Sequence, residues 1–518
     1  MIRAIDIKAE LAARPMLRGR STQTPEAEAR AAFAVLAPFR DGSIFAGSFS
    51  GETPWERHRN GDELVHVLDG AATLTIMTDG GPQSFTLTAG MVVVVPQGHW
   101  HRFHAPDGVT VLSATPQPTD HTAVADPRRS PAASTRCLIG LRPKPILAQP
   151  GLDLHTSPTM RFGWLTLGLS PSPEEDAAAI DAQVAQACFA EKAGFDGIWL
   201  TEHNFTGESV YCDPIPFASV VAARTSRIRI GFAVLQLSLR HPIRLATQLA
   251  LLDNLAAGRL DVGVGHGTNY NEYEFVGYGL RSDDSRERME ETLEVMVRAW
   301  TEAPLEHHGK FYQLRLPALR PRPRQRPHPP IWRAVSSAGS VRECGRLRAP
   351  ILMARIPLAR VPERLALYDA GLAESGLDGA SQRALREQAA LWRFVHVAES
   401  QHRAEDELAA ALRQTRHHMI HARATHNPPG FAVDPARVNP WNDPRVSDAD
   451  GVRYALESAA LCGTERRVAD QVAELRDAGV HHVLCQMSSG HLPHARIMES
   501  MRRFGDGVIP QFRARRPR

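Results

Sequence analysis

Hydrophobic and polar positions follow two different patterns along the chain. In its first part, short apolar runs are separated by glycine turns, a spacing typical of a small β-sandwich or β-barrel. The runs predicted as strands are 44–46, 64–68, 72–77, 85–87, 91–95 and 109–112. A hairpin signal, Asp79-Gly80-Gly81, separates two of them. The first part of the chain is therefore predicted to be all β.

From residue 160 onward, strand-like runs alternate with segments of helical periodicity. In the segment 227–277, Ile228, Ile230 and Phe232 mark a strand, a helical pattern follows, and a second strand ends in the glycine-rich turn 263–267. Strands of this kind are predicted at 161–168, 195–201, 228–234, 260–264, 331–335, 351–355, 391–398 and 480–487. The βαβ order puts their carboxyl-terminal loops on one edge, where ligands bind. Periodicity alone allows an open doubly wound sheet or a closed (β/α)8 barrel.

These patterns divide the chain into four predicted parts. Residues 1–40 are rich in alanine and arginine and are assigned as an amino-terminal extension, and 41–118 form the all-β domain. Residues 119–158 are rich in proline, alanine, serine and arginine without periodicity, which indicates a linker. The α/β domain takes 159–518. A length of 518 residues agrees with more than one hydrophobic core.

Composition excludes several classes of function. A formal net charge of +3 gives no electrostatic basis for binding nucleic acid or a membrane surface. No stretch approaches the roughly 18 apolar residues of a membrane span, and the amino terminus lacks the apolar run of a secretory signal. The six cysteines are scattered and form no Cys-x-x-Cys pair, which indicates reduced thiols. A cytoplasmic protein is expected.

Two polar clusters interrupt the predicted strands of the all-β part. The first contains Glu56, His58 and Glu63, and Gly70 follows it. The second supplies the members of a Gly…Pro-x-Gly-x-x-His motif: Gly90, Pro96, Gly98 and His101. These spacings resemble the two motifs of the cupins, which are double-stranded β-helices. The first cupin motif begins with two histidines separated by one residue, and Glu56 stands here in place of the first of them.

The cupin resemblance implies a set of metal ligands, namely Glu56, His58, Glu63 and His101. Carboxylate and imidazole groups together suit a divalent metal such as Mn, Fe or Zn. The alternative is that the same side chains line a metal-free pocket. The domain could accordingly be a metal-dependent dioxygenase or isomerase, or a ligand-sensing module that regulates the second domain, because the fold by itself does not decide.

Two segments of the α/β part carry a second resemblance. Residues 194–205 contain Glu202-His203-Asn204 directly after a predicted strand, and 227–277 end in the glycine-rich turn with His266. Together they resemble the bacterial luciferase-like, flavin-dependent monooxygenases, over roughly residues 160–512. The resemblance implies the closed TIM-type (β/α)8 barrel. It also implies an enzyme that uses reduced FMN and O2 to oxygenate a small organic substrate, with the FMN reduced by a separate NAD(P)H-dependent flavin reductase. A homo-oligomer is expected.

The luciferase resemblance assigns roles to individual residues. His203, with Glu202 beside it, takes the place of the acid/base histidine near the reacting edge of the flavin. Imidazole suits this role because it exchanges protons near neutral pH. Phe232 and Ala233 end the third barrel strand, where the family has a cis peptide under the isoalloxazine ring.

The flavin phosphate is expected at the ends of two other strands. His266 stands where the luciferase has an arginine that contacts the phosphate. The second place is the predicted helix start after strand 331–335, formed by Ser336, Ser337, Ala338, Gly339 and Ser340. Hydroxyl and backbone N–H groups at a helix N-terminus form an anion site, although a serine-rich helix cap without a ligand has the same composition.

Two other functions are compatible with the same barrel. One is hydride transfer with the deazaflavin coenzyme and without O2. Relatives of that kind usually carry Asp-His where this chain has Glu202-His203, which favours FMN. The other is a non-catalytic flavin-binding partner.

Overall fold

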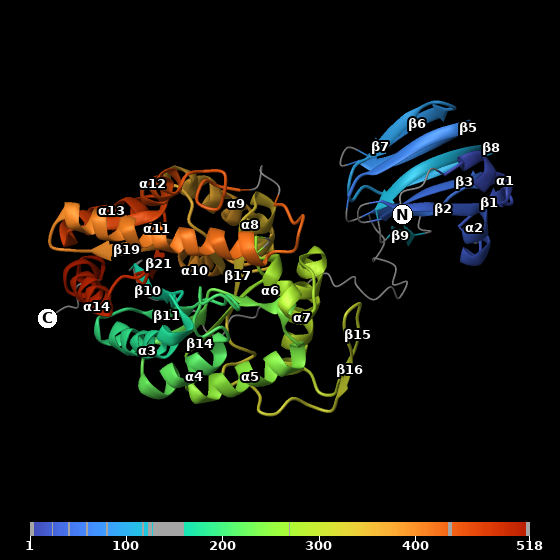
Figure 1. Cartoon of the computed structure of the whole chain (residues 1–518). Helices are drawn as coiled ribbons and strands as arrows, with labels where there is room; N and C mark the ends of the chain where they lie inside the picture. The colour runs from blue at the N-terminus through green and yellow to red at the C-terminus, as the bar shows by residue number, and fades with distance from the viewer. Residues whose placement is uncertain are drawn as a thin grey trace. The chain divides into compact units, whose positions relative to one another are not determined.

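A computed structural model gives the architecture of the protein (Figure 1). The structure describes residues 5–22, 24–39, 42–58, 61–78, 81–116, 119–122, 127, 160–268, 270–433 and 438–513. The chain divides into two compact units, Met1–Cys137 and Leu138–Arg518. Of the predicted linker, only 119–122 and 127 are among the described residues.

The first unit is a nine-stranded, mostly antiparallel β-structure. Its strands are β1 (Leu17–Arg20), β2 (Phe33–Phe39), β3 (Gly42–Glu52), β4 (Trp55–His58), β5 (Glu63–Thr78), β6 (Gly81–Thr88), β7 (Val92–Val95), β8 (His101–Pro116) and β9 (Thr119–Thr122). The long strand β8 pairs with both β3 and β5. Alternate residues such as Val65, Val67 and Leu74 are buried in one core. The predicted all-β fold of this part is confirmed.

Two predicted strands, 64–68 and 72–77, are one continuous strand, β5. Asp69 and Gly70 between them have turn-like composition, but they form a bulge at which the register against β8 shifts. Gly70 has a φ of 74°, and a Cβ there would lie 2.4 Å from the carbonyl oxygen of Gly108. Glycine therefore bends the strand without ending it. The predicted hairpin is present, because β5 and β6 pair up to Thr78 and Gly81.

The all-β unit extends beyond 41–118 on both sides. In the predicted extension 1–40, β1 pairs parallel with β3 and β2 pairs antiparallel with it. Two short helices, α1 (Ile7–Ala12) and α2 (Glu26–Ala32), belong to the same segment. On the other side, β9 pairs with β4 although it was predicted as linker. Both segments cover backbone edges that would otherwise lack hydrogen-bond partners.

The second unit is a closed barrel of eight parallel strands. In ring order they are β10 (Arg161–Thr166), β11 (Gly197–Leu200), β12 (Arg229–Phe232), β14 (Leu260–Gly265), β17 (Ile331–Val335), β18 (Ile351–Met353), β19 (Ala390–Val397) and β21 (His482–Gln486). The pairing of β12 with β14 and of β21 with β10 closes the ring. Each strand falls on a predicted run, and the closed barrel is confirmed against the open sheet.

Helices surround the barrel, as Figure 1 shows. The long ones are α3 (Asp176–Lys192), α4 (Pro214–Arg224), α5 (Pro242–Leu255), α7 (Ser285–Thr301), α8 (Ala338–Arg346), α9 (Val361–Ala373), α10 (Gly379–Gln388), α11 (Gln401–His426), α12 (Asp448–Ala459), α13 (Glu465–Asp477) and α14 (His494–Arg503). Short additions are α6 (Glu272–Gly277), β13 (Leu235–Gln236), β20 (Ala460–Gly463) and the hairpin of β15 (Leu305–His308) with β16 (Gln313–Leu316). Among the residues described, no helix combines the length and the apolar character that a membrane crossing requires.

The cysteines of the described chain are free thiols, as predicted. Three are buried, Cys344, Cys462 and Cys485, and two are half-buried, Cys188 and Cys212.

Aromatic side chains fill the interior of the barrel. Trp199 of β11 packs edge-on against Trp332 of β17 and against His482 of β21, with ring centres 5.1 and 5.7 Å apart. Glycines on both neighbouring strands make room for the Trp199 indole. A Cβ added at Gly163 or Gly231 would lie 2.5 or 2.6 Å from indole atoms. These two glycines are therefore required by the close packing of one large side chain.

Gly231→Ala is expected to lower the free energy of unfolding by about 1–3 kcal/mol, because the added methyl overlaps the Trp199 indole. Urea unfolding followed by circular dichroism measures the change. The matched control is Gly379→Ala at the exposed start of α10, where the nearest atom to an added Cβ is a flexible guanidinium nitrogen at 3.6 Å. Its effect should stay within about 0.5 kcal/mol. Equal effects of the two substitutions would contradict the packing argument.

Candidate active site

His203 lies at the carboxyl-terminal rim of the barrel, in the loop that follows β11. Its Nδ1 lies 3.3 Å from Oε1 of Glu274 on α6, and its Nε2 lies 3.7 Å from Oε1 of Glu208. Both carboxylates are buried, whereas the imidazole side chain keeps 20% of its surface exposed. The ring is therefore flanked by acids on both sides and still accessible to a ligand.

Three amide groups hold the Glu274 carboxylate in place. Asn204 and Gln236 donate to Oε2 at 3.2 and 2.6 Å, and Asn271 donates to Oε1 at 2.7 Å. Burial acts to raise the pKa of Glu274, but the hydrogen bonds with His203, Asn271 and Gln236 outweigh it and lower the pKa. The carboxylate is ionised and has a fixed position.

The two carboxylates also decide the charge of His203. Burial acts to lower the pKa of the imidazole, but the charge of Glu208 and the hydrogen bond with Glu274 outweigh it and raise the pKa to about 9. Arg423 has a smaller opposing effect. His203 is consequently protonated at neutral pH and able to donate a proton to a bound ligand.

Glu202, predicted beside His203 as a catalytic residue, is bound to the loop after β12. Its carboxylate accepts hydrogen bonds from the backbone N–H of Gln236 at 2.9 Å and from the guanidinium of Arg240 at 2.8 Å. Burial acts to lower the pKa of Arg240, but the negative charge of Glu202 outweighs burial and raises this pKa. Within the described residues, no hydrogen bond or ion pair joins the side chains of Glu202 and His203. A catalytic role for Glu202 stays a prediction.

Phe232 and Ala233 end β12 and enter the loop. Phe232 is fully buried in the main core, and Ala233 packs against the aromatic cluster inside the barrel. A cis peptide bond joins Ala233 to Val234. The predicted contact of Phe232 and Ala233 with a flavin stays a prediction.

The predicted phosphate site lies at the start of α8, directly after β17. Ser337 Oγ accepts a hydrogen bond from the N–H of Ser340 at 3.1 Å, and Ser340 Oγ accepts one from the N–H of Ser337 at 3.2 Å. Both hydroxyls thus serve the helix cap. Ser336, Ala338 and Gly339 are exposed, and a Cβ at Gly339 would meet no atom within 4 Å. The backbone N–H groups of the first turn, more than the hydroxyls, are open to an anion.

His266 follows β14, the strand next to β17. Its Nδ1 is buried and has no hydrogen-bond partner in the described part of the chain. Burial and the charges of Arg286 and Arg333 lower the pKa of His266, so the ring is neutral at pH 7. An unpaired ring nitrogen near two guanidinium groups suits an anion such as a phosphate.

No sequence motif marks the residues that position His203. These are Glu208, Gln236, Asn271 and Glu274, whereas Arg240 holds Glu202. Asn271 and Glu274 meet because the turn into α6 brings positions three apart together. The sequence feature that could have identified them is the polar pair Asn271 and Glu274, which follows the glycine-rich turn 263–267.

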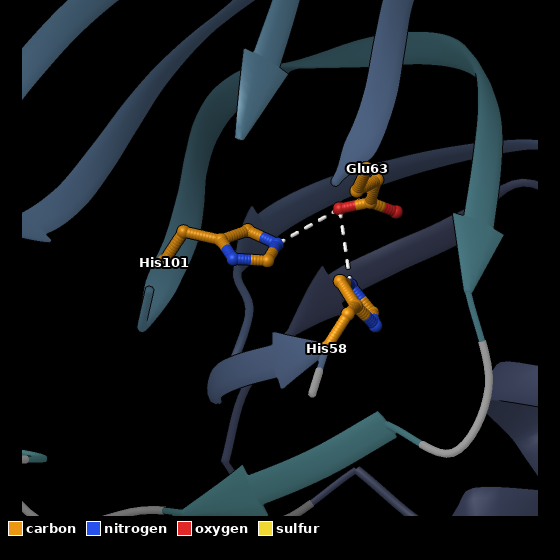
Figure 2. A group of neighbouring side chains, drawn as sticks. All are labelled: His58, Glu63 and His101. Carbon is orange, nitrogen blue, oxygen red and sulfur yellow. Dashed lines mark ion pairs between the residues drawn. The ribbon is translucent and has the colours of Figure 1, made fainter. Parts of the chain in front are cut away.

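The predicted metal ligands of the first unit meet inside the β-structure (Figure 2). His58 ends β4, Glu63 begins β5 and His101 begins β8. Oε2 of Glu63 lies 3.1 Å from Nε2 of His58 and 2.9 Å from Nε2 of His101. All three side chains are buried, and among the described residues these three atoms make no well-aligned hydrogen bond. The three groups converge on one point, as metal ligands do.

Glu56 stands at the edge of this cluster, with Oε1 3.6 Å from Nε2 of His101 and 17% of its side chain exposed. Oε1 of Glu63, the carboxylate oxygen that does not face the two histidines, accepts a hydrogen bond from Thr115 Oγ1 at 2.5 Å. Burial acts to raise the pKa of Glu63, but the two histidines outweigh it and lower the pKa to about 2. An ionised carboxylate with two imidazoles fits a divalent cation, and Glu56 is a candidate fourth ligand.

Comparison with known proteins identifies both units. The model of the luciferase-like monooxygenase family matches residues 160–482, and the model of the cupin domain matches residues 49–114. The chain therefore belongs to the luciferase-like monooxygenase family, a class of flavin-dependent enzymes, and carries a cupin domain before its barrel.

Individual relatives agree with this assignment. Protein y4wF of Sinorhizobium fredii is 30% identical over 341 residues, which are 64% of this chain and 92% of that protein. The oxygenase component of the flavin-dependent trigonelline monooxygenase of Acinetobacter baylyi is 28% identical over 182 residues, 35% of this chain and 50% of that protein. This chain thus spans about half the length of the second relative. The crystal structure of the monooxygenase RslO1 from Streptomyces bottropensis matches 68% of this chain and 100% of its own, with a TM-score of 0.59 and 25% identity.

Glu274→Gln is expected to lower the pKa of His203, because it removes a negative charge from the imidazolium. A folded-state pKa raised from 6.5 to about 9 adds stability that is complete below 6.5 and is lost as the pH rises through 9. The loss of unfolding free energy in Glu274→Gln should therefore be largest near pH 6 and smaller near pH 9.5, as measured by urea unfolding at each pH.

The control for this prediction is Glu306→Gln, which removes the carboxylate from the solvent-exposed pair of Glu306 with His308. Solvent screens that pair, so the substitution should have little effect at either pH. A pH-independent effect of Glu274→Gln would contradict the assigned charge of His203.

Proposed function

We propose that this protein is a monooxygenase that uses reduced FMN and O2 to oxygenate a small organic substrate at the carboxyl-terminal rim of its barrel. The observation that carries the proposal is the accessible imidazolium of His203 between the carboxylates of Glu208 and Glu274. The start of α8, which is open to an anion, follows β17 of the same parallel ring as β11. Carboxyl ends of parallel barrel strands face one rim, where TIM-barrel enzymes have their active sites.

The chain would hold the flavin at its two ends. The phosphate would bind to His266, to the Arg286 guanidinium and to the first turn of α8, whose residues are Ser336, Ser337, Ala338, Gly339 and Ser340. The ring would lie against Phe232 and Ala233. When bound, FMN supplies the electrons and activates the oxygen. The barrel contributes orientation and protection from water.

His203 would move the proton. In the imidazolium, Nδ1–H is directed to Glu274 at 3.3 Å, which leaves Nε2–H for an oxygen atom of a ligand. Glu208, 3.7 Å from Nε2, stabilises the charge without a direct hydrogen bond. After donating a proton, the neutral ring can take one back from the substrate side.

The electrons would come from a separate protein. The relative from Acinetobacter baylyi is described as the oxygenase component of its monooxygenase. By analogy, an NAD(P)H-dependent flavin reductase would deliver reduced FMN to this chain. Glu202-His203, rather than Asp-His, favours FMN over the deazaflavin coenzyme.

The cupin domain would bind a divalent metal, Mn, Fe or Zn. The supporting observation is that ligand atoms of His58, Glu63 and His101 all lie within 4.8 Å of one another and are buried. These residues, with Glu56, would hold the ion. A metal in such a site acts as a Lewis acid toward an oxygen ligand.

Titration with reduced FMN and with reduced riboflavin tests the flavin site, because riboflavin lacks the phosphate. Gly339→Glu is expected to weaken the binding of FMN about tenfold or more, since it adds a negative charge at the anion site. Riboflavin binding should change little. Gly339→Gln is the matched control, because the open space at Gly339 accepts either side chain. If the wild-type chain binds neither reduced nor oxidised flavin, the proposal fails, and tighter binding of the deazaflavin than of FMN would favour hydride transfer instead.

Metal content of the full-length chain tests the cupin site. About one equivalent of Mn, Fe or Zn per chain is expected by mass spectrometry after the chain is supplied with the three ions. Glu63→Gln or His101→Ala should lose most of it, because each removes one of the three converging ligands. His104→Ala, an exposed histidine on the same strand, should retain it. A wild-type chain without metal would contradict the proposal.

A further inference from the structure

Arg355 follows β18 at the carboxyl-terminal rim of the barrel and lies against three aromatic rings. Its guanidinium carbon is 4.4 Å from the ring centre of Trp392, 4.7 Å from that of Phe394 and 5.6 Å from that of Trp441. Aromatic faces attract a cation but leave its N–H donors without strong acceptors. Within the described residues, the Arg355 guanidinium forms no hydrogen bond and no ion pair. Its donors are available to a ligand.

Three other arginines of the barrel unit, Arg416, Arg259 and Arg393, have oxygen partners in the protein. Arg416 pairs with Asp448 and donates to two backbone carbonyls. Arg259 donates to three carbonyls and a hydroxyl, and Arg393 donates to one carbonyl. Within the described residues, Arg355 therefore lacks the oxygen partners that these three guanidinium groups have. Burial lowers the pKa of Arg355 to about 10, and the charge of Glu208 offsets this effect only in part.

A cavity of about 10 Å³, which has room for about one water molecule, adjoins the guanidinium of Arg355. Its polar lining consists of Asn439, Tyr454 and Ser458, and Phe394 and Trp441 form its apolar walls. The amide of Asn439 and the phenol of Tyr454 can each donate to an oxygen atom, whereas the hydroxyl of Ser458 already donates to the backbone carbonyl of Tyr454. Flat aromatic walls beside a planar guanidinium favour a planar anion over a tetrahedral one.

Arg355 and His203 follow strands on opposite sides of the barrel. In the ring order, β18 stands four strands from β11 in either direction, so it is opposite the strand that leads to His203. Both side chains therefore belong to the rim of the barrel, and both experience the charge of Glu208.

We propose that Arg355 is the anchor for a carboxylate group of the substrate, so that the enzyme takes small organic acids. The carboxylate would accept the guanidinium donors at the edge of this cavity, with one oxygen in the place of a water molecule and the rest of the acid outside the cavity. Arg355 determines specificity and takes no part in proton transfer. The proposal rests on the function proposed for the rim, because only a flavin site there makes an anchored acid a substrate.

Acid and amide pairs of nearly equal shape test the anchor on the full-length chain. The probes are acetate with acetamide and benzoate with benzamide, titrated calorimetrically with and without FMN. In at least one pair the acid is expected to bind about tenfold or more tightly than the amide, as a charge-assisted contact requires. Equal affinities within both pairs, or no binding of either acid, would overturn the proposal.

Substitutions test whether Arg355 causes the preference for the acid over the amide. Arg355→Gln should remove the preference for the acid, and Arg355→Lys should retain part of it, because lysine keeps the charge but loses the planar fork. Arg360→Gln is the matched control, since Arg360 is an exposed arginine nearby in the chain that pairs with Glu363. It should bind the acids as the wild type does. A preference for the acid that persists in Arg355→Gln would overturn the proposal.

Flavin titration of the same variants separates the two proposals. Arg355→Gln should bind reduced FMN as the wild type does, which also shows that its barrel is folded. If the wild-type chain binds no flavin but prefers the acids through Arg355, the proposed function fails and the anion site stands. If it binds flavin but shows no preference for the acids, only the anchor fails.

Discussion

The rim of the barrel depends on one buried negative charge, the carboxylate of Glu274. An ionised carboxylate out of water costs several kcal/mol unless hydrogen bonds surround it. Here the partners come from three places in the chain: His203 and Asn204 after β11, Gln236 after β12, and Asn271 before α6. Each loop is held at the position where its donor reaches the acid. The same interaction that orders the loops also keeps His203 charged, so structure and proton chemistry have a common cause.

The fold of the second unit was accessible from the sequence because both faces of its strands are covered. Runs such as 228–234 and 260–264 are mostly apolar, and their charged members Arg229 and Asp261 pair with each other; helices with glycine ends separate the runs. Closure of the barrel could not be predicted from periodicity, because it depends on the pairing of β12 with β14 and of β21 with β10. Only the family resemblance supplied it. In the first unit, β1 and β2 were missed because tertiary pairing with β3 overrides their weak local preference.

Residues with a motif could be predicted, and residues without one could not. His203, His58, Glu63 and His101 sit at the ends of strands, where sequence position determines spatial position. Their partners lie on loops whose conformations follow from long-range contacts. Glu202 shows the converse: it is adjacent to His203 in sequence, but its side chain is occupied by Arg240. Arg355 carries no motif, and its aromatic neighbours come from β19 and from a segment far along the chain.

The indole of Trp199, with Trp332 and His482 around it, closes the interior of the barrel below the rim. A small molecule therefore cannot pass along the barrel axis through the middle of the ring. In the proposed function, flavin, oxygen, substrate and product would all enter and leave at the carboxyl-terminal rim, so the order in which they bind and leave would depend on this shared route. A ligand that dissociates slowly would then delay the binding of the next one.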